Sequence, residues 1–195
     1  MHWNHVDLKD SALRRNVSLW MPAAAVNAMW IEDVEPDHLN RIHLADADSA
    51  APGRCRAAAA KCSTVIDAHI RDARVIVEMI FWGEGGAARA RNELTYLQTR
   101  GLRDASWDLS VGSAAAGEDD YSEADFAIAA GVIDRTGVEL LCSVPLWADF
   151  GGAPEFDRYL SFELYIASLD GSIVANPYDD RGMWIASSSI RDTFE

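Results

Sequence analysis

Hydrophobic and polar residues alternate along much of the second half of the chain. Alternation with a period of two predicts β-strands, because successive side chains of a strand point to opposite faces of a sheet. This pattern appears in four segments, which are 107–111, 126–134, 138–147 and 159–168. A fifth segment, 74–82, is almost continuously apolar and rich in β-branched residues. It predicts a central strand that is covered on both faces.

Other segments place their apolar residues at the spacing of an α-helix. Residues 52–70 keep a single apolar face, and residues 87–100 follow the same period until Gly101. Apolar residues at helical spacing also occur between residues 10 and 30. The glycine-rich segment 83–86 precedes the second helix and could in principle cradle a phosphate. We interpret it as a tight turn instead, because it contains an acid and no lysine follows.

The order of these elements predicts an α+β fold in which helices pack on an antiparallel or mixed sheet. We expect the sheet to contain 74–82, 126–134, 138–147, 159–168 and 173–175, with a hairpin turn at 134–137. A length of 195 residues fits one domain, 1–195. Within it we expect a helical N-terminal extension over 1–35 and an α+β core over 36–195.

The chain is strongly acidic, with 31 acidic residues against 17 lysines and arginines and a formal net charge of −14. Binding to nucleic acid or to anionic lipid is not expected, because both rest on Lys and Arg contacts. Two interpretations of the charge remain open, which are solubility alone and attraction to a basic partner. No apolar run approaches the ~20 residues of a membrane span. The N-terminus shows no signal peptide, so we expect a soluble cytoplasmic protein.

Cysteine and histidine give little support for catalysis or metal binding. The three cysteines, Cys55, Cys62 and Cys142, are odd in number and lack CxxC spacing, which fits reduced thiols in a cytosol. His2 and His5 could share a metal only with further ligands that the neighbouring sequence does not supply. We therefore expect no cofactor and no metal.

The segment 176–185 carries the most chemistry, since two acids, an arginine and a glycine stand between two apolar runs. Pro177 predicts that the incoming strand ends there, and Gly182 allows a positive φ where the chain reverses. Asp179 and Asp180 can accept bonds from nearby backbone N–H groups. The segment is either a loop tied by its own Asp–Arg pairs or a site for a ligand or partner.

A second polar segment, 117–125, is a loop with five acidic side chains, Glu118, Asp119, Asp120, Glu123 and Asp125, around Tyr121. Such runs are commonly solvated. In a binding protein they would also suit a basic cleft.

The segment 173–183, which contains Tyr-Asp-Asp-Arg-Gly at 178–182, resembles the C-terminal signature of a bacterial domain family of unknown function. The segment 41–44 before a helix and the apolar strand 74–82 are similar in order to the same family, with departures at Ile42 and His43. Members of this family occur beside polymorphic toxins as candidate immunity proteins. The resemblance therefore implies a fold and a genomic neighbourhood, and it covers roughly residues 30–191.

Two functions follow from these observations. In the first, an immunity (antitoxin-like) protein binds and neutralises a cognate, basic toxin domain without a cofactor. Its expected partner-binding residues are Glu118, Asp119, Asp120, Tyr121, Glu123, Asp125, Tyr178, Asp179, Asp180 and Arg181. In the alternative, a small hydrolase or metal-dependent enzyme uses Asp179 and Asp180 as metal ligands or as an acid/base pair, and Arg181 holds an anionic substrate.

Overall fold

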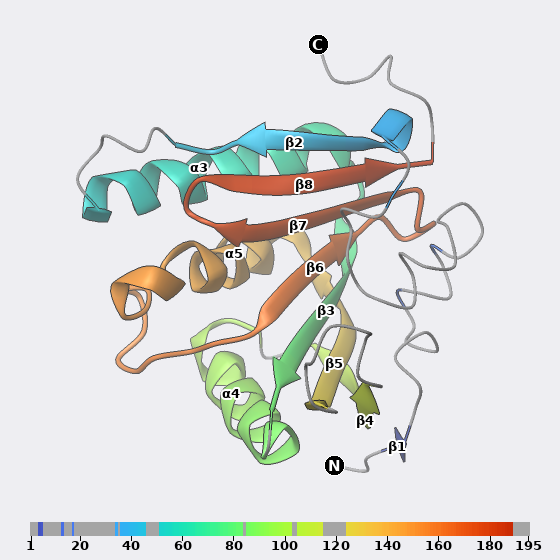
Figure 1. Cartoon of the computed structure of the whole chain (residues 1–195), viewed down its shortest axis with the longest axis vertical. Helices are drawn as coiled ribbons and strands as arrows, with labels where there is room; N and C mark the ends of the chain where they lie inside the picture. The colour runs from blue at the N-terminus through green and yellow to red at the C-terminus, as the bar shows by residue number, and fades with distance from the viewer. Residues whose placement is uncertain are drawn as a thin grey trace.

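The described part of the chain is built around one mixed β-sheet of eight strands in the order β1-β4-β5-β3-β6-β7-β8-β2 (Figure 1). The computed structural model describes residues 4–5, 13, 17, 34, 36–45, 51–83, 85–102, 105–114 and 124–188. The strands are β1 (Asn4–His5), β2 (Leu39–His43), β3 (Arg74–Trp82), β4 (Ser106–Ala114), β5 (Ala124–Asp134), β6 (Glu163–Ala167), β7 (Ile173–Asp179) and β8 (Gly182–Ser187). Every neighbouring pair is antiparallel except β1 and β4.

Three of the described helices pack on one face of this sheet, which confirms the predicted α+β fold. They are α3 (Ala51–His69), α4 (Gly86–Arg100) and α5 (Val138–Leu146). Three short 3-10 turns are also described, with η3 (Pro36–His38) before β2, η4 (Arg135–Gly137) between β5 and α5, and η5 (Ala148–Phe150) after α5. Figure 1 shows α3 running beside β2 and β8, with α5 beside β7 and α4 near β3 and β5. Helices α3 and α4 confirm the helices predicted over 52–70 and 87–100.

Strand β3 is the central strand that its apolar sequence predicts. It pairs with β5 on one side and with β6 on the other. Val77, Met79 and Phe81 are fully buried in the core that contains the helices. Ile80 points to the opposite face and is equally buried there. Burial of both faces explains why the sequence of β3 does not alternate.

The face opposite the helices carries a second, smaller core. Leu13, Val17 and Val34 are buried against side chains of β3, β5 and β7 on this face. Leu13 and Val17 are both helical, as predicted. The rest of the helical region expected between 10 and 30 lies outside the described residues.

The strand predicted over 138–147 is wrong, because these residues form helix α5. Its buried positions include Val138, Leu141 and Cys142, which recur at intervals of three and four residues. Because residues between these positions are apolar as well, the sequence also fits the period of two that is typical of a strand. The hairpin predicted at 134–137 is wrong for the same reason, since the chain leaves β5 through a 3-10 turn into a helix.

The predicted end of a strand at Pro177 is also wrong, because β7 continues to Asp179. Pro177 lies opposite Met183, and the register shifts between Pro177 and Asp179. Proline lacks the N–H that a strand ladder uses, and a bulge tolerates this loss. The bulge therefore lets β7 carry its pairing up to the turn. The segment predicted over 159–168 holds a shorter strand, β6.

The turn predicted at 83–86 is confirmed. Gly83 has a φ of 91° and Gly85 a φ of 76°, both in the left-handed region that favours glycine. A side chain on Gly86 would place its Cβ 2.6 Å from the carbonyl oxygen of Phe81.

In the described part of the chain, none of the helices combines the length and the apolar character that a membrane span needs.

Candidate interaction site at the turn between β7 and β8

The turn between β7 and β8 is fixed by Asp179. One carboxylate oxygen, Oδ1, accepts the backbone N–H groups of Arg181 at 2.8 Å and Gly182 at 3.0 Å. The other, Oδ2, accepts a bond from Nε of Arg181 at 2.9 Å. The side-chain bond to Asp179 and the charge of this carboxylate raise the pKa of Arg181 above its already high value. The predicted turn, tied by its own Asp–Arg pair, is confirmed for Asp179 and Arg181.

Asp180 has a different partner, on a different element. Its side chain is buried and pairs with Nε of Arg54 in helix α3, 126 residues away in sequence. The backbone N–H of Leu44 bonds the carbonyl of Arg181 at 2.8 Å. The turn is therefore joined to α3 and to the end of β2.

Arg54 extends this connection to the surface. Its guanidinium carbon lies 5.2 Å from the ring centre of Phe150, which belongs to η5. The Phe150 side chain is 36% exposed, and Arg181 nearby is 57% exposed. Asp149 also lies close enough to contribute to the raised pKa of Arg181. We call Arg54, Phe150, Asp179 and Arg181 the motif patch.

Tyr178 does not belong to the motif patch. Nε of Arg41 donates to the Tyr178 hydroxyl at 2.8 Å. The Arg41 guanidinium lies 5.7 Å from the Tyr178 ring centre and 5.6 Å from that of Trp184. Trp184 packs on the second core, whereas Asp180 faces the helices. The residues of the Tyr-Asp-Asp-Arg-Gly segment therefore make contacts on both faces of the sheet.

Gly182 is required for space. It does not have a positive φ, contrary to the expectation from sequence. A Cβ at this position would lie 2.1 Å from the hydroxyl oxygen of Tyr178 and 2.7 Å from its Cζ. Glycine thus allows the Tyr178 ring to lie across β8 and reach Arg41.

The carboxylates of the turn are already engaged by arginines and backbone donors. This arrangement suits a rigid surface better than a general base, which needs an available lone pair near a substrate. Burial and the neighbouring Asp180 raise the pKa of the Cys55 thiol to about 11, so this thiol stays protonated at neutral pH. Within the described ranges, no three side chains of His, Cys, Asp or Glu gather as metal ligands.

The predicted acidic loop cannot be placed relative to this turn. Glu118, Asp119, Asp120, Tyr121 and Glu123 lie outside the described residues. Asp125 is in β5, where its backbone pairs with Ser113, and its side chain lies outside the description. Of the ten predicted partner-binding residues, the structure brings together Asp179, Asp180 and Arg181.

Sequence reasoning missed Arg54, Phe150, Arg41 and Trp184. Arg54 carries no local signal, because its partner is on another element, far along the chain. Phe150 had a weak signal, since it is an aromatic residue between an acid and two glycines. Such a position favours a short exposed loop.

The fold and the site define an α+β protein in which a Tyr-Asp-Asp-Arg-Gly turn connects both faces of the sheet at one end. The chain belongs to the family described as a domain of unknown function (DUF3885), whose model matches residues 39–193. No curated protein and no solved structure matches the chain.

Proposed function

We propose that this protein is a cytoplasmic immunity protein, which binds and neutralises a cognate bacterial toxin domain. The observation that carries the proposal is that the motif patch exposes the aromatic ring of Phe150, which packs on Arg54, and the guanidinium of Arg181, which is held by Asp179. Aromatic residues and arginine are enriched where protein interfaces concentrate their binding energy.

The side chains of the motif patch already have partners within the protein before any binding partner arrives. Asp180 fixes Arg54, and Arg54 supports the ring of Phe150. Asp179 holds Arg181 through a side-chain pair. Because these side chains are already ordered, binding costs less conformational entropy than it would for free side chains. This arrangement favours a preformed contact surface.

The charge of the chain favours a basic partner. A net charge of −14 accelerates encounter with a basic protein and disfavours acidic ones. A toxin domain that acts on a nucleotide or a nucleic acid has a basic active site, and this protein would mask it. We expect the acidic segment 117–125 to contribute to the same attraction. The family resemblance to candidate immunity proteins supports the same choice.

Co-expression with the neighbouring reading frame tests the proposal. The neighbour alone should arrest bacterial growth, and growth should recover when this protein is co-expressed. Phe150→Ser should reduce the protection, whereas Leu169→Ser should keep it. Leu169 is a matched control, because it is 47% exposed and lies in the turn between β6 and β7. Immunoblots should show equal amounts of both variants.

Two results would contradict the proposal. In the first, the neighbour is harmless alone, or stays toxic and unbound in the presence of this protein. In the second, Phe150→Ser and Leu169→Ser protect equally well, which would remove the motif patch from the interface.

A further inference from the structure

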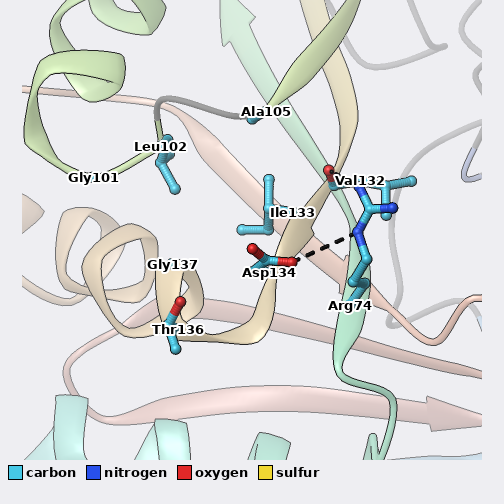
Figure 2. Close-up of a pocket in the computed structure, with 9 residues that line it drawn as sticks. All are labelled: Arg74, Gly101, Leu102, Ala105, Val132, Ile133, Asp134, Thr136 and Gly137. Atoms are coloured by element: carbon cyan, nitrogen blue, oxygen red, sulfur yellow. Dashed lines mark hydrogen bonds and ion pairs between the residues drawn. The ribbon is translucent and has the colours of Figure 1, made fainter.

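A separate cavity of about 360 Å³ lies between the end of α4, the end of β5 and the turn η4 (Figure 2). It is open to solvent and is lined by none of the residues of the motif patch. Its volume falls within the range of small-molecule sites, about 300 to 1,000 Å³. The nature of its lining indicates what kind of molecule it could take.

One wall of the cavity is apolar and fixed. Leu102 and Ile133 are both buried, and Figure 2 shows their side chains pointing toward each other. The backbone N–H of Leu102 bonds the carbonyl of Leu97 at 3.2 Å, which ends α4. A Cβ on Gly137 would lie 2.5 Å from Cδ2 of Leu102. Glycine therefore lets η4 close the wall.

Two polar groups, both exposed to solvent, face this wall. Figure 2 shows the Asp134 carboxylate and the Thr136 hydroxyl directed into the cavity. Among the described residues, the only partner of the Asp134 carboxylate is Nε of Arg74, at 3.7 Å. This distance is too long for a hydrogen bond. Arg74 instead donates through Nη2 to the carbonyl of Val132 at 3.3 Å.

We propose that this cavity binds a small primary amine with a short apolar body. The ammonium group donates to the Asp134 carboxylate and the Thr136 hydroxyl, and the body lies against Leu102 and Ile133. A chain with a net charge of −14 concentrates cations at its surface and repels anions. Arg74 competes with the ligand for Asp134, so it sets an upper limit on affinity.

Titration of the isotope-labelled full chain with 3-methylbutylamine, followed by NMR, tests this site. The amine should shift the backbone amide signals of Leu102, Ile133 and Thr136, with a dissociation constant on the order of 1 mM. Two further probes, 3-methylbutanol and 3-methylbutanoate, share the carbon skeleton of the amine but not its positive charge. Each should bind at least about tenfold more weakly, because neither supplies an ammonium group to Asp134.

Variants separate this site from general attraction to an acidic surface. Asp134→Asn should weaken amine binding about tenfold, and Thr136→Val should weaken it by a smaller factor. Asp37→Asn removes the same charge from an exposed position in η3, which leads into β2 at the edge of the sheet, and should leave binding unchanged. Arg74→Gln should tighten binding, because it removes the competitor.

The proposal is overturned if 3-methylbutylamine and 3-methylbutanoate bind equally, or if Asp134→Asn and Asp37→Asn behave alike. Signal shifts that spread over the surface, without a concentration at the cavity, would also overturn it. Tighter amine binding by Arg74→Gln would support the proposal directly. A purely structural role for Asp134 gives no reason to expect it.

Discussion

Asp179 and Asp180 are adjacent in sequence, but their surroundings give them different energetic roles. Asp179 is paired with an arginine that is 57% exposed, and it also accepts two backbone N–H bonds. Loss of that arginine leaves the carboxylate with its backbone donors and water. Asp180 is 3% exposed and depends on Arg54. Loss of Arg54 leaves a buried charge without that partner.

We therefore expect Arg54→Ala to destabilise the protein by about 3–5 kcal/mol, the usual cost of removing one partner of a buried pair. Arg181→Ala should cost much less, because exposed pairs are screened by water. Chemical denaturation of both variants measures the difference. Equal losses for Arg54→Ala and Arg181→Ala would show that the Arg54–Asp180 pair does not anchor the turn.

Glu93 makes a second prediction at this scale, on pH. Burial raises the pKa of this carboxyl to about 7, and a weak bond from the Ser161 N–H at 3.4 Å offsets only part of the effect. A raised carboxyl pKa means that the folded state favours the proton. The preference of the folded state for protonated Glu93 contributes fully to stability below the unfolded pKa of 4.5. This contribution is lost as pH rises through the folded pKa of about 7.

Glu93→Gln should therefore be more stable than the wild type at pH 8, by up to about 3 kcal/mol, and the advantage should vanish near pH 4. Denaturation curves of both proteins across this range give the comparison. Parallel pH profiles would mean that Glu93 ionises normally in the folded protein.

The site was partly predictable from sequence, and the residues explain the limit. The Asp179–Arg181 pair is local, so turn chemistry alone predicts it. The Asp180–Arg54 pair depends on the packing of α3 against the sheet, which no local pattern encodes. Gly182 was correctly given importance, but the reason is the approach of the Tyr178 ring, a tertiary contact.

At the scale of elements, Arg135 explains how η4 is joined to α3. Its guanidinium pairs with Asp67 and donates to the carbonyls of Ile66 and Ile70, at the C-terminal end of the helix. The last carbonyls of a helix lack partners within the helix, so such a side chain satisfies them. The same residue marks the change from β5 to α5.

Arg135→Ala should destabilise the protein by about 1–3 kcal/mol and accelerate amide hydrogen exchange in the last turn of α3. Arg135→Lys should recover little, because a single ammonium cannot match the guanidinium fork. Arg71→Ala provides a control, since it removes an exposed arginine close to the end of the helix. If Arg71→Ala and Arg135→Ala had the same effect, the capping role would be wrong.

Helices and strands could be predicted from the sequence where the apolar residues followed a single pattern. The continuous apolar run of β3 and the helical faces of α3 and α4 admitted one interpretation each, and the structure confirms them. Helix α5 was missed because it is buried on nearly all sides, so its sequence shows no polar face. The bulge at Pro177 was missed because local rules end a strand at proline, whereas pairing with β8 extends it.

At the scale of the whole molecule, the proposed function gives the acidity of the chain a role in how it meets a partner. Long-range attraction between an acidic and a basic protein raises the association rate and is weakened by salt. Affinity depends instead on desolvated contacts such as the one we propose at Phe150. The two effects can therefore be separated by kinetics.

Neutralising Glu118, Asp119, Asp120, Glu123 and Asp125 together should slow association with the toxin domain more than it accelerates dissociation. The wild-type association rate should fall as salt rises, and the neutralised variant should show a weaker salt dependence. Surface plasmon resonance at several salt concentrations measures both rates. If the neutralised variant changed only the dissociation rate, these acids would contact the toxin domain directly. They would then not act through long-range attraction.

The most direct test of the central claim is the affinity of the purified protein for the product of its neighbouring reading frame, measured by isothermal titration calorimetry. We predict a one-to-one complex with a nanomolar dissociation constant, at least tenfold weaker for Phe150→Ser and unchanged for Leu169→Ser. The absence of binding at micromolar concentrations, or equal affinities for the two variants, would contradict the account.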